Sequence, residues 1–352
     1  MSMGKNILFD DFDYIINSEL GIDDLRDKTI LVTGATGLIG SYLVRFLLYC
    51  NESIGLNVKV LAVIRNVEKA NTIFQNYNKE NLKLVISDLE KDRLNIHGSI
   101  DYIIHAAAVT NSKMLISKPM SALRLAINGT ESVLQIAKEK KINSMVYLSS
   151  MEVYGQPLSK KEVSENDLGF IDLTNIRSGY PESKRLCEYM CNTYAEQYNL
   201  DIKVIRASQT FGAGILPNEN RVFAQFARSV IKGENLILHT EGNSEGNYVY
   251  IADALKGILW LLLNVSAGQT YNLVNEQCHM SIKEMANLVV DNFGNNNQKV
   301  IIDIPEANMG YAPEVHMKLS GKKIMKTGWA PKYNLKEAYG RLISWIKSGI
   351  KY

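Results

Sequence analysis

The sequence of 352 residues is poor in several features that mark particular classes of protein. Lys and Arg (39) nearly balance Asp and Glu (37), which leaves a net charge of +2. A balance this close gives no electrostatic reason to expect nucleic acid or an anionic membrane as a partner. No apolar run approaches the roughly 20 residues needed to span a bilayer. The first residues show no basic-then-apolar signal pattern, so we expect a cytoplasmic protein.

Cysteine is also scarce, and the four present do not predict a metal or redox site. Cys187 and Cys191 lie four residues apart on one face of an expected helix, which could suggest such a pair. No nearby histidine or second cysteine pair completes a set of ligands. We therefore expect buried free thiols and no bound metal. The remaining composition, 46% hydrophobic and 22% charged, is typical of a globular protein with a substantial core.

What the chain does contain begins with a glycine-rich loop. The β-branched run at 28–33 leads into Gly34-x-x-Gly37-x-x-Gly40, and an apolar helical stripe follows. Gly34 permits a tight turn out of the strand, Gly37 leaves room for phosphate, and Gly40 allows the helix to lie close to the sheet. The amino end of that helix offers free N–H groups to an anion. The segment predicts a dinucleotide-binding site.

Apolar runs and helical stretches alternate through the first 207 residues. After the run at 28–33, the expected strands are Val58–Ile64, Leu82–Ile86, Tyr102–Ile104, Met145–Leu148 and Ile202–Ile205, and the expected helices lie at about 38–50, 67–77, 118–140 and 178–199. Buried strands that alternate with helices indicate an α/β fold with a doubly wound parallel (Rossmann) sheet. Tyr271–Val274 is a further candidate strand of this sheet.

Three parts of the chain follow from this pattern. Helical spacing at 7–26 predicts an N-terminal helical arm at 1–27. The dinucleotide-binding domain is expected at 28–207, with about 250–275 added. Beyond residue 207 the alternation ends, and we expect a smaller substrate-binding lobe at 208–249 and 276–352. This lobe should lie over the carboxyl edge of the strands, where ligands bind in open α/β sheets.

A second signal is the tyrosine–lysine pair in Ser178-Gly-Tyr180-Pro181-Glu-Ser-Lys184. Residues four apart on a helix share one face. Free tyrosine has a pKa near ~10, and a neighbouring ammonium should lower it toward the range of a general base. Pro181 suits the start of a helix, and Ser178 is a candidate cap. By itself the pair also fits a solvated helix face.

Other segments favour the catalytic interpretation. Ser149 and Ser150 end the expected fifth strand, so Ser150 can bind the hydroxyl that Tyr180 would deprotonate. The small side chains after His105, at 106–108, leave room for a cofactor. Asn128-Gly-Thr lies in the following helix.

Together these residues resemble the extended short-chain dehydrogenase/reductase superfamily, in its nucleotide-sugar epimerase/dehydratase branch. The resemblance spans about residues 28–345. Its motifs are Gly34-x-x-Gly37-x-x-Gly40, Asp88, His105-Ala-Ala-Ala, Asn128-Gly-Thr, Ser149-Ser150, Val153-Tyr154-Gly155, Tyr180-x-x-x-Lys184, the segments 206–214 and 248–253, and Gly328-Trp-Ala-Pro331.

The resemblance implies an NAD(P) site and a nucleotide-diphosphate sugar as the substrate. The implied cofactor-binding residues are Gly34, Thr36, Gly37, Leu38, Ile39, Gly40, Arg65, Asp88, Leu89, Ala106, Ala107, Ala108, Asn128, Ser149, Tyr180 and Lys184. The implied substrate-binding residues are Thr110, Ser112, Met151, Gln209, Arg221 and Asn247. A homodimer is also expected.

The implied reaction opens with oxidation of the sugar, usually at C4. Tyr180 takes the hydroxyl proton while hydride passes to the nicotinamide, Ser150 orients the hydroxyl, and Lys184 lowers the tyrosine pKa. The transient 4-keto sugar can then undergo elimination, epimerisation or decarboxylation. Dehydratases acting on dTDP-glucose carry an aspartate and a glutamate after the catalytic hydroxyl, whereas this chain has Met151 and Glu152. Methionine cannot donate a proton, so Glu152 alone remains as a candidate acid or base.

Two further positions differ from the family pattern. Members commonly have an arginine near Asn247 that contacts the diphosphate, so Arg221 is a possible substitute; many carry an aspartate near Lys318. At the end of the second strand, Arg65 stands where NAD-preferring sites usually place a carboxylate. A guanidinium suits a 2′-phosphate, so we favour NADP over NAD.

Several functions stay open at this point. An epimerase or dehydratase leads, with a UDP-glucuronate-type decarboxylase or an NADPH-consuming keto-sugar reductase on the same scaffold as alternatives. A cofactor-binding protein without catalysis is a further alternative, against which the intact Tyr180, Lys184 and Ser150 argue.

Overall fold

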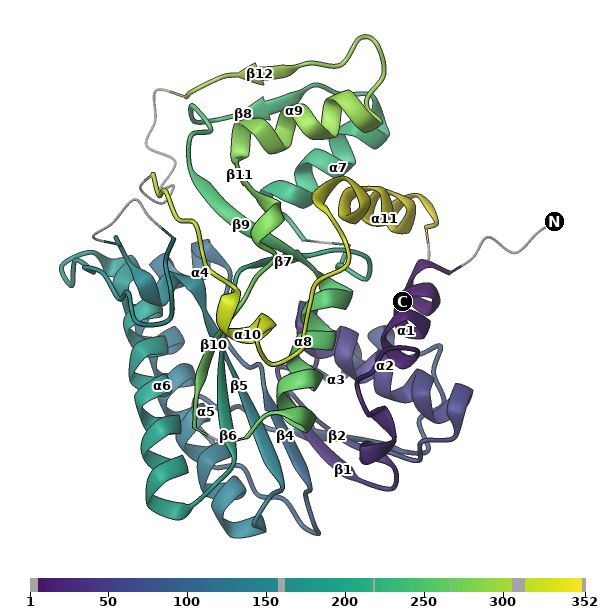
Figure 1. The fold of residues 1–352 in the computed structure, drawn as a ribbon, viewed down its shortest axis with the longest axis vertical. Helices are drawn as coiled ribbons and strands as arrows, with labels where there is room; N and C mark the ends of the chain where they lie inside the picture. Colours follow the sequence, from purple (N-terminus) through teal and green to yellow (C-terminus); the bar gives the residue numbers. More distant parts are fainter. Residues whose placement is uncertain (1–5, 158–161, 218, 267, 306–313, 350–352) are drawn as a thin grey trace.

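A seven-stranded parallel sheet forms the centre of the protein (Figure 1). The computed structural model describes residues 6–157, 162–217, 219–266, 268–305 and 314–349. The strands are β1 (Thr29–Thr33), β2 (Lys59–Ile64), β3 (Leu82–Ile86), β4 (Tyr102–His105), β5 (Ser144–Ser150), β6 (Ile202–Ala207) and β10 (Thr270–Leu273). Their order is β10-β6-β5-β4-β1-β2-β3, and every neighbouring pair is parallel. The predicted doubly wound sheet is confirmed, including its last strand.

Helices cover both faces of this sheet (Figure 1). Side chains alternate along a strand, so Leu31 and Ile103 enter one core with α5 (Pro119–Lys140) and α6 (Gly179–Tyr198). The next residues, Val32 and Ile104, enter the opposite core with α2 (Leu38–Ile54) and α8 (Ile251–Asn264). Shorter helices, α3 (Val67–Ile73) and α4 (Ser112–Ser117), complete the layers. The strands are apolar throughout because both faces are buried.

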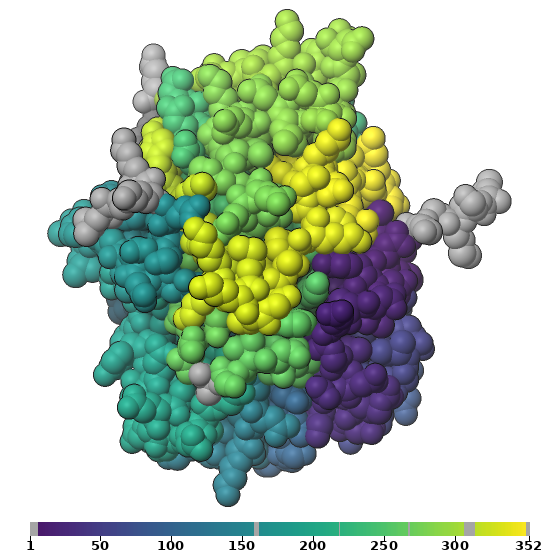
Figure 2. Space-filling model, in the orientation of Figure 1, coloured from purple at the N-terminus to yellow at the C-terminus, as the bar shows by residue number. Residues whose placement is uncertain are grey.

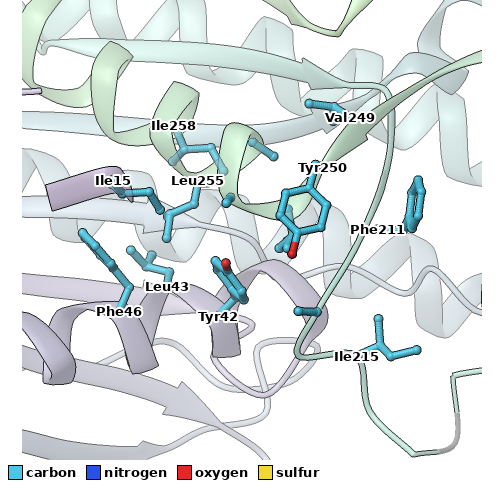
Figure 3. Close-up of a cluster of buried hydrophobic side chains, with 14 of the residues drawn as sticks. Ile15, Tyr42, Leu43, Phe46, Phe211, Ile215, Val249, Tyr250, Leu255 and Ile258 are labelled. Atoms are coloured by element: carbon cyan, nitrogen blue, oxygen red, sulfur yellow. The ribbon is translucent and has the colours of Figure 1, made fainter. Parts of the chain in front are cut away.

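An N-terminal helix, α1 (Ile7–Ile16), packs beside α2 and α8, and the 3₁₀ turn η1 (Ile22–Leu25) follows it. Figure 3 shows Ile15 of α1 meeting Leu43 of α2 and Leu255 of α8. Asp11 is fully buried in this region and accepts hydrogen bonds from the hydroxyls of Tyr42 (2.9 Å) and Tyr250 (2.6 Å). Its other oxygen lies 2.5 Å from the guanidinium of Arg341. One carboxylate thereby ties α1 to segments far away in the sequence.

The rest of the chain forms smaller sheets and helices over the carboxyl edge of the central sheet. A three-stranded sheet has the order β11-β9-β7, and β8 pairs with β12. Figure 2 shows C-terminal residues (yellow) lying beside α1 (purple) on this side of the molecule. The elements are β7 (Gln209–Phe211), α7 (Val222–Lys232), β8 (Leu236–Leu238), β9 (Glu245–Tyr250), β11 (His279–Ser281), α9 (Ile282–Phe293), β12 (Val300–Ile302), α10 (Lys322–Met325) and α11 (Leu335–Lys347), with the 3₁₀ turns η2 (Met151–Tyr154), η3 (Ile176–Ser178) and η4 (Glu276–Cys278).

Some local predictions are wrong. Ser178 does not cap α6 with its side chain: its hydroxyl donates to the Asp172 carbonyl, and η3 runs directly into the helix. Asn175 instead caps that 3₁₀ turn. The helix expected at 67–77 ends at Ile73. The four cysteines are buried and unpaired, as predicted. Among the described residues, no helix combines the length and apolar character that crossing a bilayer requires.

Candidate active site

The glycine loop is tightly packed between the ends of β1 and β4. Gly34 has φ +66°, and a Cβ there would lie 2.6 Å from the Ala106 carbonyl oxygen. A Cβ on Gly40 would lie 2.2 Å from the Gly34 carbonyl oxygen, so the first turn of α2 packs directly on the loop. A Cβ on Gly37 would meet only the Gly34 oxygen, at 3.2 Å. The first and third glycines thus shape the loop, and the middle one leaves its outer side open.

His105 at the end of β4 holds this region together as a neutral imidazole. The backbone N–H of Ala107 donates to the Thr33 hydroxyl oxygen (3.2 Å), and the same hydroxyl is hydrogen-bonded to His105 Nδ1 (2.6 Å). The other ring nitrogen, Nε2, is hydrogen-bonded to the Thr130 hydroxyl (3.1 Å), so one ring nitrogen donates and the other accepts. Burial, with Lys184 nearby, lowers the pKa of His105 to about 3. The histidine therefore joins β1, β4 and α5 without carrying charge.

One face of α6 meets the last residues of β5 at three successive turns. Tyr180 is hydrogen-bonded to Ser150, and Lys184 Nζ donates to the Leu148 carbonyl (2.6 Å). Glu188 accepts a hydrogen bond from the Ser149 hydroxyl (2.5 Å). The spacing i, i+4, i+8 brings all three onto one stripe. The structure thus brings the predicted Tyr180, Lys184 and Ser150 together, whereas the Ser149 hydroxyl, expected at the cofactor, is committed to Glu188.

Burial moves the pKa values of this pair in opposite directions. It raises the pKa of Tyr180 above its usual range, and Glu152 adds to the rise while Ser150 and Arg221 oppose it. It lowers the pKa of Lys184 from 10.5 to about 8, and the carboxylate of Glu188 opposes that shift. Lys184 was expected to lower the tyrosine pKa. That expectation stays a prediction; in the chain itself the net pKa of Tyr180 is raised, because loss of water around the phenol and the charge of Glu152 outweigh Ser150 and Arg221.

Glu152 lies on η2, immediately after β5. Solvent reaches its side chain, yet the protein around it raises the pKa of its carboxyl, against the effect of Arg177. Glu152 also contributes to the pKa rise of Tyr180, so the two side chains border the same space. Glu152 therefore faces the same space as the Tyr180 hydroxyl.

Arg177 is the residue of this site that the sequence reasoning missed. It lies on η3, three residues before Tyr180, and is partly exposed. Within the described part of the chain, its guanidinium has no hydrogen-bond or ion-pair partner. Its spacing from Tyr180 on a continuous helical segment was a usable signal. It places a positive charge next to the Glu152 carboxyl.

The predicted substrate residues divide into two groups. Asn247 is fully buried: its Oδ1 accepts from the Leu319 N–H (2.7 Å) and its Nδ2 donates to the Asn275 carbonyl (3.3 Å). Its role in binding substrate stays a prediction, and in this structure the amide holds two backbone segments inside the fold. Arg221 remains partly exposed and lies near Tyr180, with both carboxylate oxygens of Glu219 against it at 3.0 and 2.7 Å.

The other predicted substrate residues lie at the carboxyl edge. Met151 is half-buried on η2, next to Glu152, and Gln209 is exposed at the start of β7. Thr110 and Ser112 are exposed at the start of α4, which Asn111 caps.

The predicted cofactor residues surround the ends of β1 to β4. Asp88 follows β3, and its carboxylate accepts from the Glu90 N–H (3.3 Å) within a tight turn. Asn128 of α5 supports the same turn by donating to the Glu90 carbonyl (2.9 Å). Arg65 is exposed at the end of β2, and its charge adds to burial in lowering the pKa of Lys69. The remaining cofactor residues lie around the glycine loop and the adjacent strand ends: Thr36, Leu38 and Ile39, the half-buried Ala106 to Ala108, and the buried Leu89.

This fold and this grouping of side chains define a nucleotide-cofactor enzyme of the doubly wound type. A family model described as the NAD dependent epimerase/dehydratase family matches residues 30–275, and the chain belongs to that family. It is 26% identical over 328 residues to UDP-glucuronic acid decarboxylase 1 of Xenopus tropicalis, covering 92% of this chain and 73% of that protein. It is 25% identical over 342 residues to dTDP-D-glucose 4,6-dehydratase of Bos taurus, covering 93% and 91%.

Solved structures share the fold at lower identity. The structure of the epimerase Mth375 of Methanothermobacter thermautotrophicus matches with a TM-score of 0.77 at 20% identity, covering 98% of this chain and 96% of that one. UDP-glucuronic acid 4-epimerase of Bacillus cereus, in complex with UDP-glucuronic acid and NAD, matches with a TM-score of 0.73 at 21% identity, covering 92% and 100%.

The residues present fit the NAD that the family implies. The outer side of Gly37 is open, where a Cβ would otherwise approach a diphosphate. The Ser87 hydroxyl at the end of β3 is buried with no hydrogen-bond partner among the described residues. The small side chains of Ala106 to Ala108 leave room for a cofactor at the end of β4. The glycine loop would hold the diphosphate, and Tyr180 and Lys184 would lie toward the nicotinamide ribose.

Proposed function

We propose that the protein modifies a nucleotide-diphosphate sugar through a transient 4-keto intermediate. The observation that carries this proposal is the contact between Tyr180 and Ser150, beside the accessible carboxyl of Glu152. A bound nicotinamide would accept the hydride from C4 of the sugar. The Tyr180 oxygen would take the C4 hydroxyl proton, with Ser150 fixing the direction of that hydroxyl.

The step after oxidation depends on Glu152. The ketone acidifies the hydrogen on each neighbouring carbon, and a carboxylate at this position can remove such a proton or return one. Met151 offers no second proton donor. A mechanism that needs paired acidic side chains at these two positions is therefore disfavoured, and one that needs a single carboxyl is favoured.

A decarboxylase is the second candidate, and Arg177 favours it. A guanidinium without an ion-pair partner among the described residues is suited to a substrate with its own carboxylate. A UDP-glucuronate-type substrate would supply that group and would lose it as CO₂ from the 4-keto acid. In that reaction Glu152 would return a proton to the carbon that the carboxylate leaves. The decarboxylase from Xenopus tropicalis, to which this chain is similar, acts on such a substrate by its name.

For the cofactor we propose a preference for NADP. Arg65, just after β2, and Lys69, in the first turn of α3, carry two positive charges close enough for one to influence the other. No carboxylate occupies the end of β2 to accept bonds from a free ribose 2′-hydroxyl. A 2′-phosphate would relieve the repulsion between the two cations.

We also propose a homodimer through the face that contains α4, the start of α5 and α6. Exposed large apolar residues gather in this part of the chain, and a second copy would cover them. They are Met114, Ile116, Met120, Leu168, Phe170, Leu173, Ile176, Leu186 and Tyr189, with Leu173 75% and Tyr189 68% exposed. Separation by size with light scattering tests this proposal.

The deciding experiment offers the purified protein UDP-, dTDP-, GDP- and CDP-sugars, including UDP-glucuronate, and follows product mass and absorbance at 340 nm. Epimerisation keeps the mass, dehydration loses water and decarboxylation loses CO₂. Stoichiometric consumption of NADPH would instead identify a reductase. Tyr180→Phe should bind the cofactor normally and lose about 10²–10⁴-fold in kcat. If none of the sugars is converted while cofactor binding is intact, the result would support the alternative of a cofactor-binding protein without catalytic activity.

Glu152→Gln separates the classes of reaction. In a dehydratase or decarboxylase, the variant should oxidise the sugar and then stall, with reduced nicotinamide accumulating on the enzyme. A simple 4-epimerase should be little affected. Wild-type single-turnover kinetics in the variant would remove Glu152 from the mechanism.

A further inference from the structure

A buried ion pair joins Glu188, the last of the three residues on the stripe of α6, to Arg206 of β6. Glu188, one turn beyond Lys184, accepts hydrogen bonds from Arg206 Nε (3.0 and 3.1 Å) and Nη2 (2.7 Å). The two side chains are 7% and 6% exposed. Breaking such a pair on one side leaves an uncompensated buried charge, so the pair strongly restrains α6 relative to β6.

The pair also reaches the strand that carries the catalytic serine. The Glu188 oxygen that faces Arg206 Nε accepts the Ser149 hydroxyl as well, at 2.5 Å. Ser149 is the neighbour of Ser150, and Lys184 holds Leu148 on the other side. Three consecutive residues of β5 are therefore bonded to three successive turns of α6. The contact between Tyr180 and Ser150 joins the two proposed reacting hydroxyls, and Lys184 belongs to the proposed cofactor site; Glu188 lies one turn beyond Lys184.

Arg206 extends the restraint beyond the helix. Its Nη1 donates to the Tyr154 hydroxyl (3.1 Å), and the Tyr154 hydroxyl donates to Asn272 (2.5 Å). Tyr154 closes η2, the turn that carries Glu152. Asn272 in turn donates to the Ser320 carbonyl (3.0 Å), in the C-terminal part of the chain. One guanidinium thus links the helix of the proposed base to the turn of the proposed second carboxyl.

We propose that Glu188 and Arg206 are positioning residues, which set the Tyr180 oxygen and the Glu152 carboxyl relative to the sugar. The proposal rests on the function proposed above. Neither residue touches the reacting atoms. Their proposed effect on rate is through geometry, since a misplacement of about 1 Å can cost on the order of 10²-fold in rate; the Glu188 carboxylate also favours the ionised form of Lys184.

The same strand offers a matched control at its opposite end. Lys203 of β6 is fully buried, bonds the Ser144 hydroxyl (2.9 Å) and forms an ion pair with Asp201. This pair lies at the amino edge of the sheet, away from the catalytic stripe. Lys203→Met should lower stability without changing the rate of the folded enzyme.

The test uses the full chain loaded with NAD(P) and the sugar nucleotide that the wild type turns over. Glu188→Gln should slow single-turnover nicotinamide reduction at 340 nm by about 10²-fold. The single variant leaves Arg206 as an uncompensated buried charge, so a double variant, Glu188→Gln with Arg206→Met, removes both charges at once. The double variant should show the same loss of rate. KM and the cofactor affinity measured by calorimetry should change less than threefold, and Lys203→Met should keep the wild-type rate.

A second readout does not depend on turnover. In protein labelled with ¹³C at tyrosine Cζ, the Tyr180 resonance is assigned by its loss in Tyr180→Phe. Glu188→Gln should shift that resonance and Lys203→Met should not. An unmoved resonance, or an equal rate loss in the Lys203 control, would overturn the positioning role. A wild type that acts on none of the sugars would refute the proposed function, while the resonance still tests the positioning.

Discussion

Replacing Lys184 by methionine should separate the stability of this protein from its chemistry. Lys184 is 3% exposed, and burial lowers its pKa from 10.5 to about 8. Among the described residues its ammonium has one hydrogen-bond acceptor, the Leu148 carbonyl, and it lies 4.7 Å from the centre of the Tyr147 ring. Methionine keeps all but the last atom of the side chain's length and removes its charge. The change therefore removes the unfavourable burial of a charge, which opposes folding. It also removes the ammonium from the proposed site.

The size of that cost follows from the pKa. One pKa unit corresponds to about 1.4 kcal/mol, so the ionised form of Lys184 costs the folded chain about 3 kcal/mol relative to the neutral amine. The folded pKa lies below the unfolded one, so wild-type stability rises as pH increases from about 8 toward 10.5. Between pH 7 and pH 9.5 the rise amounts to about 2 kcal/mol. In Lys184→Met this contribution is absent.

Urea unfolding of both proteins at pH 7 and pH 9.5 measures the difference directly. Taking wild type minus variant cancels the other groups that titrate in this range, including the buried tyrosines. Lys184→Arg, which stays ionised at both pH values, should lack the rise as well. Both variants should lose turnover and cofactor affinity. Parallel pH profiles of wild type and Lys184→Met would refute the reasoning, because they would mean that the ammonium is already well solvated in the fold.

Three further changes test other parts of the structure. Arg65→Ala should remove most of an expected preference of at least tenfold for NADP over NAD, measured by titration calorimetry; equal affinities in the wild type would refute that preference. Gly40→Ala should destabilise by about 1–3 kcal/mol, because its Cβ would lie 2.2 Å from the Gly34 oxygen, whereas Gly179→Ala, with open space, should not. Burial raises the pKa of Asp11 to about 6, so between pH 7.5 and pH 5 the stability of the wild type should increase relative to that of Asp11→Asn by about 1 kcal/mol in melting experiments; taking the difference cancels other titrating groups such as His105.

The central fold could be predicted because its signals are local. The glycine spacing, the β-branched runs and the helical stripes each lie within about 20 residues, and the chain order of strand and helix limits how they can pack. The Tyr180–Lys184 pair was predictable for the same reason, since four residues on a helix return to one face. Arg177 lies on the same helical segment and could have been found by extending that spacing one turn backward.

Other features depend on contacts that the local sequence does not contain. Asn247 was assigned to the substrate because of where it stands in a motif, yet its amide bonds Asn275 and Leu319, which come from other parts of the chain. Ser149 is similar, because its partner Glu188 lies 39 positions further on. A polar side chain near a site binds a ligand only if nothing inside the fold satisfies it first.

The pKa values of the Tyr180–Lys184 pair likewise could not be predicted from the local sequence. Spacing alone predicted that the ammonium would lower the tyrosine pKa, since it specifies how close two groups lie. It does not specify how much water each group loses. In the structure that loss keeps Tyr180 protonated and shifts Lys184 toward the neutral amine, so burial opposes the active form of both groups. Charges that do favour ionisation come from elsewhere: Arg221 acts on Tyr180 and Glu188 on Lys184. The charges that oppose burial at this pair therefore belong to residues that its own motif does not include.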